Sequence, residues 1–286
     1  MENNSLSCFF PAEIRSELAA LPISADVVRE IRLRAEAPIV VIREKTYMGE
    51  KKIDSAMISQ TAQRFCQNSL YARQEELRNG FVTLPGGHRA GFCGRAVMEG
   101  GRVRALTDIS SINLRIAHEI RGAADKVLPS LLSGNDIYNT LIVSPPGAGK
   151  TTLLRDIARQ IGSPEYGFRV GIADERGEIA AMHRGVPQND IGIFTDVYDG
   201  FPKADAIMML LRGMAPKVVI TDELGSEADE EAVRALVHRG VRVICSLHGT
   251  GREDALSRPG IGSLLRQGIF KKVVTLGGVG KIISIE

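Results

Sequence analysis

The second half of the chain alternates short apolar runs with longer helical stretches, a pattern typical of a parallel sheet with crossover helices. Apolar runs that predict strands occupy residues 137–143, 168–173, 218–221, 241–246, 271–276 and 281–285. Polar side chains follow three of these runs, as Asp174-Glu175, Asp222-Glu223 and His248. Because ligands bind at the carboxyl ends of strands in open α/β sheets, we expect these side chains to meet at one site.

The first third of the chain mixes both periodicities, which indicates an α+β domain. Helical spacing is found at residues 11–21, 55–68, 70–77 and 120–133. Strands are predicted at 28–34, 38–42, 102–106 and 111–116, with two more on either side of a Pro-Gly-Gly turn at 85–87. The composition places a domain boundary within residues 118–136, and we assign residues 1–125 to the first domain and 126–286 to the second.

A glycine-rich loop separates the first predicted strand of the second domain from its first helix. It reads Ser144-Pro145-Pro146-Gly147-Ala148-Gly149-Lys150-Thr151-Thr152, and strand–loop–helix is the context that a phosphate-binding P-loop requires. The backbone N–H groups of residues 147–150 would surround a β-phosphate at the helix N-terminus. Lys150 would add a charge between the β- and γ-phosphates, and the Thr151 hydroxyl would bind Mg²⁺. Ser144 replaces the first glycine of the usual pattern, a departure that could alter the entry to the loop.

A second motif, Lys217-Val-Val-Ile-Thr-Asp-Glu223, is an apolar strand that ends in two acids. Asp222 would hold Mg²⁺, which accepts few protein carboxylates and keeps several waters. Glu223 would polarise the water that attacks the γ-phosphate. The alternative is a solvated strand end or a helix cap. Together with the P-loop, this motif predicts an α/β domain, following the smaller α+β domain, that binds a nucleoside triphosphate with Mg²⁺.

Two further strand ends carry groups that suit phosphate chemistry. Glu175 could assist Mg²⁺ or orient water, and Arg176 could reach a phosphate. The alternative is an ordinary ion-pair cluster in the loop, which suits Glu178 at least as well. His248 could sense the γ-phosphate, with a role as a satisfied structural histidine as the alternative.

Composition narrows the class of protein. The chain has 286 residues, is 44% hydrophobic and has a net charge of +2, so nothing draws it globally toward nucleic acid. Its four cysteines lack C-x-x-C spacing, which argues against zinc and disulfides and fits a reducing cytosol. No stretch approaches the ~20 apolar residues of a membrane helix, and the N-terminus has no signal-peptide pattern. We expect a soluble, intracellular protein with no membrane span.

Beyond these patterns, the chain resembles the stage III sporulation protein AA family of endospore-forming bacteria, an offshoot of the secretion-type ATPases. In the first domain the resemblance rests on Glu30-Ile-Arg-Leu-Arg34, Gly86-Gly-His-Arg-Ala-Gly91 and Ser110-Ser-Ile-Asn-Leu-Arg115. In the second it rests on Ala173-Asp-Glu-Arg-Gly-Glu-Ile179, Gly185-Val-Pro-Gln188, Thr195-Asp-Val197, Pro202-Lys203-Ala204, Met208-Met-Leu210 and Thr221-Asp-Glu223. Two residues depart from the family pattern: Ser144 replaces the first glycine of the P-loop, and Gly177 stands where a serine is common.

The resemblance implies a fold, a RecA-like P-loop ATPase core with ATP and Mg²⁺ as its ligands, and a specific biological role. It implies an ATPase in the mother-cell cytoplasm, peripheral to the membrane, that acts at the membrane-embedded channel between mother cell and forespore. It implies a homo-oligomeric ring, a hexamer, docked on channel proteins rather than on lipid. In family terms, residues 174–178 resemble the acidic box of secretion ATPases and His248 their histidine box.

Two other classes of function compete with this interpretation. A nucleic-acid-associated RecA-like ATPase is disfavoured because the sequence ends directly after the last predicted strand and has no basic patch interleaved with aromatic residues. A scaffold that binds ATP with little turnover is disfavoured by the intact motif residues. Among the arginines, Arg176, Arg115 and Arg121 are candidates to neutralise transition-state charge, each with a surface ion pair as the alternative.

Overall fold

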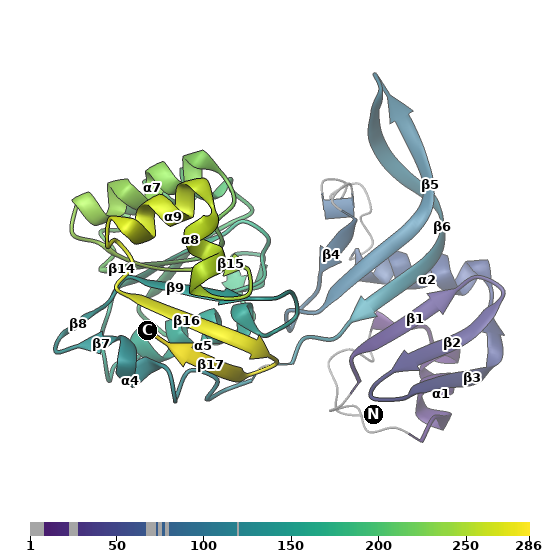
Figure 1. Cartoon of the computed structure of the whole chain (residues 1–286). Coiled ribbons are helices and arrows are strands. Elements are labelled where there is room, and N and C mark those ends of the chain that lie inside the picture. The colour runs from purple at the N-terminus through teal and green to yellow at the C-terminus, as the bar shows by residue number, and fades with distance from the viewer. Residues whose placement is uncertain (1–8, 23–27, 67–72, 74–75, 78–79, 119) are drawn as a thin grey trace. The chain divides into compact units, whose positions relative to one another are not determined.

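The computed structural model describes residues 9–22, 28–66, 73, 76–77, 80–118 and 120–286 (Figure 1). The chain divides into two compact units, Met1–His118 and Glu119–Glu286. Residues 120–125, which the sequence analysis placed in the first domain, therefore lie in the second unit. The reason is local: Ala124 is buried in the core of that unit, and its N–H donates to Asp156 Oδ2 at 2.8 Å.

The N-terminal unit is built on a six-stranded antiparallel sheet of order β3-β2-β1-β6-β5-β4. Its strands are β1 (Glu30–Arg34), β2 (Ala37–Ile42), β3 (Thr46–Ile53), β4 (Phe81–Thr83), β5 (Arg89–Glu99) and β6 (Arg102–Arg115), and its helices are α1 (Ala12–Ala20) and α2 (Ser55–Phe65). The core includes Phe10, Ile14, Leu33 and Phe65. β3 was not predicted, and the two strands predicted at 102–106 and 111–116 are one strand, β6. The helix predicted at 70–77 lies mostly outside the described residues.

The segment that enters the second unit is less helical than its spacing predicts. A helix at 120–133 was expected, but residues 121–127 form turns and only α4 (Leu128–Leu131) is helical. Gly122 adopts a φ of +81°, and Pro129 lacks a backbone donor, so neither residue supports a continuous helix. A short hairpin of β7 (Leu132–Ser133) and β8 (Asp136–Ile137) follows around Gly134, so the predicted strand 137–143 is divided.

The C-terminal unit is an α/β structure with a seven-stranded sheet of order β13-β10-β14-β15-β9-β16-β17. The strands are β9 (Thr140–Ser144), β10 (Val170–Asp174), β13 (Thr195–Asp199), β14 (Val218–Glu223), β15 (Arg242–His248), β16 (Lys272–Gly278) and β17 (Lys281–Ile285). All neighbours pair in parallel except β17, which is antiparallel to β16. The short hairpin β11 (Met182–His183) and β12 (Val186–Pro187) and the edge strand β13 were not predicted.

Helices cover both faces of this sheet (Figure 1). They are α5 (Lys150–Ile161), α6 (Lys203–Gly213), α7 (Glu227–His238), α8 (Arg252–Ser257) and α9 (Pro259–Arg266). Successive strand residues point to opposite faces. Ile142 therefore packs with α4 and α5, whereas Leu141 and Val143 pack with α6 to α9. Hydrophobic cores therefore pack against both faces of the sheet, with its carboxyl edge left between them.

Candidate nucleotide-binding site

Strand register brings the predicted polar residues to one edge of the sheet. β9 lies beside β15, and Ser144 is the direct partner of His248 in that ladder. β15 also pairs with β14, where Glu223 is the partner of Ser246. β10 lies on the other side of β14 and ends at Asp174. Strand ends far apart in the sequence therefore become neighbours, as the sequence predicted.

The loop between β9 and α5 has the backbone that a P-loop needs. Gly147 and Gly149 have φ values of +73° and +95°, in the left-handed region that favours glycine, and Gly149 caps the N-terminus of α5. Ser144, in contrast, is the last residue of β9, completely buried, and its hydroxyl donates to the Pro145 carbonyl at 2.9 Å. Its position in the strand requires no glycine. The departure from the usual motif therefore leaves the rest of the loop in place.

Lys150, His248 and Glu223 form a continuous polar chain across the site. Lys150 Nζ lies 2.7 Å from His248 Nδ1 and 3.3 Å from the Ser144 carbonyl oxygen. His248 Nε2 lies 3.1 Å from Glu223 Oε2. Burial lowers the pKa of Lys150, whereas the charge of Glu223 acts in the opposite direction. The P-loop lysine is thus linked to the acid of β14 through one imidazole.

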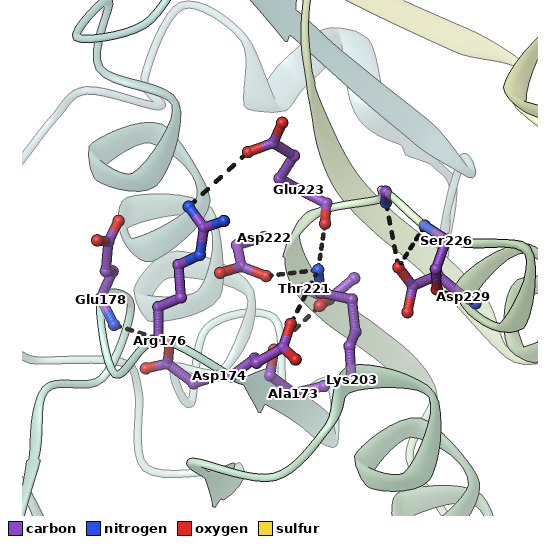
Figure 2. Close-up of polar contacts among 12 residues, drawn as sticks. Ala173, Asp174, Arg176, Glu178, Lys203, Thr221, Asp222, Glu223, Ser226 and Asp229 are labelled. Atoms are coloured by element: carbon purple, nitrogen blue, oxygen red, sulfur yellow. Dashed lines mark hydrogen bonds and ion pairs between the residues drawn. The ribbon is translucent and has the colours of Figure 1, made fainter. Parts of the chain in front are cut away.

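Asp222, the predicted metal ligand, is buried next to a cation that the sequence analysis did not assign to the site. Lys203 Nζ lies 3.0 Å from Asp222 Oδ1 and donates to the Glu223 carbonyl oxygen (Figure 2). It also lies 3.7 Å from Glu175 Oε2. Burial raises the pKa of the Asp222 carboxyl, and the Lys203 ammonium opposes that shift. One signal could have revealed Lys203: it is the first residue of α6, where the helix dipole disfavours a cation unless anions lie nearby.

The acidic segment after β10 divides into structural and site residues. Asp174 is buried and accepts the backbone N–H of Glu178 at 2.8 Å (Figure 2). It also accepts the backbone N–H groups of Ile179 and Ala180 at 3.0 and 2.8 Å, so it shapes the loop. Arg176 extends from that loop to within 3.9 Å of Glu223 Oε2. The loop therefore carries a cation toward the acids of β14.

These groups surround a cavity of about 300 Å³. It is lined by Gly147, Gly149, Lys150, Thr151, Thr152, Arg176, Glu178, Asp222, Glu223, Ser246 and His248. Most of the predicted side chains meet here. Glu175 is held by Lys203 instead, and Arg121 forms an ion pair with Asp190 at 3.1 Å. Arg115 lies in the N-terminal unit, 4.0 Å from Glu30.

The residues at this cavity are compatible with Mg²⁺. Asp222 Oδ1 is buried and makes no hydrogen bond, although it is ion-paired with Lys203. Asp222 and the hydroxyl-bearing Thr151 both line the cavity, and carboxylate and hydroxyl oxygens are ligands of the kind that Mg²⁺ prefers. Few protein ligands suffice, because Mg²⁺ keeps several waters or takes phosphate oxygens.

The parallel sheet, the loop of positive-φ glycines before α5 and the acid-ended strand β14 define a P-loop protein with a RecA-like ATPase core. The chain belongs to the family described as sporulation stage III protein AA, whose sequence model matches residues 2–285. It is 38% identical over 294 residues to stage III sporulation protein AA of Bacillus subtilis (strain 168), covering 99% of this chain and 94% of that one.

Solved structures show the same fold. The pilus retraction motor PilT with bound ADP matches with a TM-score of 0.60 at 15% identity, over 92% of this chain and 76% of that one. The Legionella pneumophila ATPase DotB matches with a TM-score of 0.57 at 16% identity, over 87% and 72%. At this level of identity the similarity establishes the secretion-ATPase fold. Within the described residues, none of the helices has the length and apolar character needed to cross a membrane.

Proposed function

We propose that this chain is an ATP-hydrolysing, secretion-type motor that energises assembly of, or transport through, the channel between mother cell and forespore. The proposed ATP hydrolysis rests on one observation: a cavity is lined together by Lys150, Thr151, Asp222, Glu223 and His248. Membership of the sporulation family and the fold shared with a pilus motor support the biological part.

In this proposal the P-loop binds the phosphates of ATP. The N-terminus of α5 and the backbone donors of residues 147–150 face anions favourably. Lys150 exchanges its contact with His248 for phosphate oxygens, because charge-assisted bonds to phosphate are stronger than a bond to a neutral imidazole. Thr151 and Asp222 hold Mg²⁺, which when bound neutralises charge on the β- and γ-phosphates.

Glu223 and His248 then carry out the hydrolytic step. The Glu223 carboxylate orients a water molecule in line with the γ-phosphate and accepts its proton. His248 holds that carboxylate in place and registers whether Lys150 has moved to a phosphate. Arg176, and Glu175 through its contact with Lys203, complete the charge balance around the reacting groups.

We further propose that copies of this chain form a hexameric ring in the mother-cell cytoplasm, docked on membrane-embedded channel proteins. The fold shared with secretion ATPases supports an oligomeric motor. Sizing the protein with and without a non-hydrolysable ATP analogue tests this part. A nucleotide-dependent shift to a discrete assembly of about six subunits is expected, and a monomer under both conditions would contradict it.

Steady-state hydrolysis of Mg²⁺-ATP by the wild-type chain beside Glu223→Gln tests the enzymatic part. We expect turnover in the wild type and its loss in the variant. ATP binding without turnover in the wild type would instead identify an ATP-binding scaffold. Strong stimulation by single-stranded nucleic acid would identify a nucleic-acid-associated ATPase.

A further inference from the structure

Lys203 occupies the kind of position that a metal ion would be expected to occupy. Its ammonium lies 3.0 Å from Asp222 Oδ1 and donates to the backbone carbonyl of Glu223 (Figure 2). A third oxygen, Glu175 Oε2, lies 3.7 Å away. An ammonium has three donors and no acceptor, so three oxygen partners satisfy it as they would a hard cation. The side chain is only 5% exposed, which makes this cation a fixed part of the site.

The position of Lys203 at the start of its helix is unfavourable for a cation without anionic partners. Lys203 is the first residue of α6, where the positive end of the helix dipole repels a cation. A buried lysine is favourable there only because two carboxylates and a carbonyl oxygen compensate its charge. The interaction with Asp222 is therefore the main reason for this arrangement, and it involves the acid to which we assign metal binding.

We infer that Lys203 is a built-in competitor of Mg²⁺ at Asp222, which makes metal binding conditional on nucleotide. In the nucleotide-free protein the ammonium already neutralises Asp222, so a divalent ion gains little from that carboxylate. The phosphates of ATP supply the additional negative charge that lets the metal bind beside Lys203. The inference rests on the proposed function, and it makes Lys203 a positioning residue for the metal.

The consequence is thermodynamic coupling between metal and nucleotide. If nucleotide raises the affinity for the metal, the metal raises the affinity for nucleotide by the same factor. Removing the Lys203 charge would reduce this coupling, because Asp222 and Glu175 would then attract a divalent ion without help from phosphate. Charges a few ångströms apart near a protein surface interact strongly enough to change affinity by about tenfold or more.

Mn²⁺ binding to the nucleotide-free protein, followed by the electron paramagnetic resonance signal of the free ion, tests this inference. Wild-type protein should bind Mn²⁺ weakly, Lys203→Met about tenfold or more tightly, and Lys203→Arg like the wild type. Lys203→Met combined with Asp222→Asn should lose the gain. Lys217→Met is the matched control, because Lys217 is a half-buried lysine beside the opposite end of β14.

Two results would overturn the inference. One is a folded Lys203→Met protein, with a thermal transition, that binds Mn²⁺ no more tightly than wild type; Lys203 would then serve only to attach α6 to β14. The other result needs no variant at Lys203. It is that nucleotide-free wild type binds Mn²⁺ at micromolar concentrations and that Asp222→Asn loses this binding. The Mn²⁺ assay uses no nucleotide. A lack of ATP turnover would therefore contradict the proposed function, but the comparison of Mn²⁺ affinities between wild type and Lys203→Met would still test the inference.

Discussion

Lys150 Nζ donates to His248 Nδ1 across 2.7 Å, joining the P-loop to the end of β15. A lysine ammonium can only donate, so Nδ1 is the acceptor and the proton of a neutral His248 is on Nε2. Nε2 lies 3.1 Å from Glu223 Oε2, so that proton is directed toward the carboxylate. The tautomer thus follows from the contacts, and the imidazole connects the residue that meets phosphate with the residue that positions water.

Replacing the P-loop lysine should remove tight nucleotide binding. Lys150→Ala deletes the only side-chain cation of the loop 144–152, and lost bonds to charged groups of about 1.5–3 kcal/mol correspond to roughly 10- to 150-fold weaker binding. Calorimetric titration with Mg²⁺-ATP measures the effect, with Lys217→Ala as the control. Wild-type affinity in Lys150→Ala would refute the assignment of the P-loop.

The two acids at the end of β14 should have separable roles. Glu223→Gln keeps the shape of the side chain and leaves Asp222 intact, so ATP affinity should remain within a few-fold of wild type. Turnover should fall by about 10²–10⁴, the usual contribution of a general base. Binding and single-turnover hydrolysis measured on the same preparation separate these effects. Equal loss of binding in Glu223→Gln and Lys150→Ala would show that the division of roles is wrong.

The imidazole of His248 should matter more for turnover than for binding. His248→Ala removes both the acceptor for Lys150 and the donor to Glu223, so we expect kcat to fall by about tenfold or more while ATP affinity changes little. His248→Gln can still donate an N–H toward Glu223 and should recover part of the rate. Identical kcat values in wild type and His248→Ala would leave the histidine with a structural role alone.

At least one of three arginines should stabilise the transition state. Arg176 lines the cavity, whereas Arg121 is paired with Asp190 and Arg115 lies near Glu30. Arginine fingers contribute about 10³–10⁵ in rate in characterised systems. Each arginine is replaced by alanine, and kcat is compared at saturating ATP. At least one variant should show a large loss of kcat, and we expect it in Arg176→Ala. Wild-type rates in every variant would end this hypothesis.

Stability should depend on pH through His88 in the N-terminal unit. This side chain is 9% exposed, and its Nδ1 accepts the Ala117 N–H at 3.0 Å. Burial, with a smaller effect of the His118 charge, lowers the pKa of His88 to about 4. The folded-state pKa lies below the unfolded value of about 6.5, so protonation of His88 favours the unfolded chain. The contribution of neutral His88 to folding stability is therefore complete above about pH 6.5 and is lost as the pH falls toward 4.

The expected size of this effect is measurable. Between pH 7 and pH 5 the free energy of unfolding of the wild type, relative to His88→Gln, should fall by about 1–2 kcal/mol. Urea unfolding at pH 7, 6 and 5 gives both series, and the non-titrating glutamine variant cancels the contributions of other groups. Parallel curves for the two proteins would show that His88 is not buried in its neutral form.

The sequence by itself determined the parts of the site that depend on neighbouring residues. The P-loop was recognisable because the left-handed glycines, the lysine and the start of the following helix lie within residues 144–152. The acids of β14 and His248 were placed correctly because parallel strands present their carboxyl ends at one edge. Local pattern failed at 120–133, where helical spacing was overridden by Gly122 and Pro129.

Only the tertiary structure decided which charges meet. Lys203 is nineteen positions before Asp222 and begins a different element. Its place at a helix start indicates that anions lie nearby, but it does not say which acid the ammonium contacts. The same holds for His248, whose two partners come from α5 and β14. Strand order and register set these distances, and they are products of packing over the whole sheet. Electrostatic partners follow distance in space, whereas sequence patterns report only what each segment prefers alone.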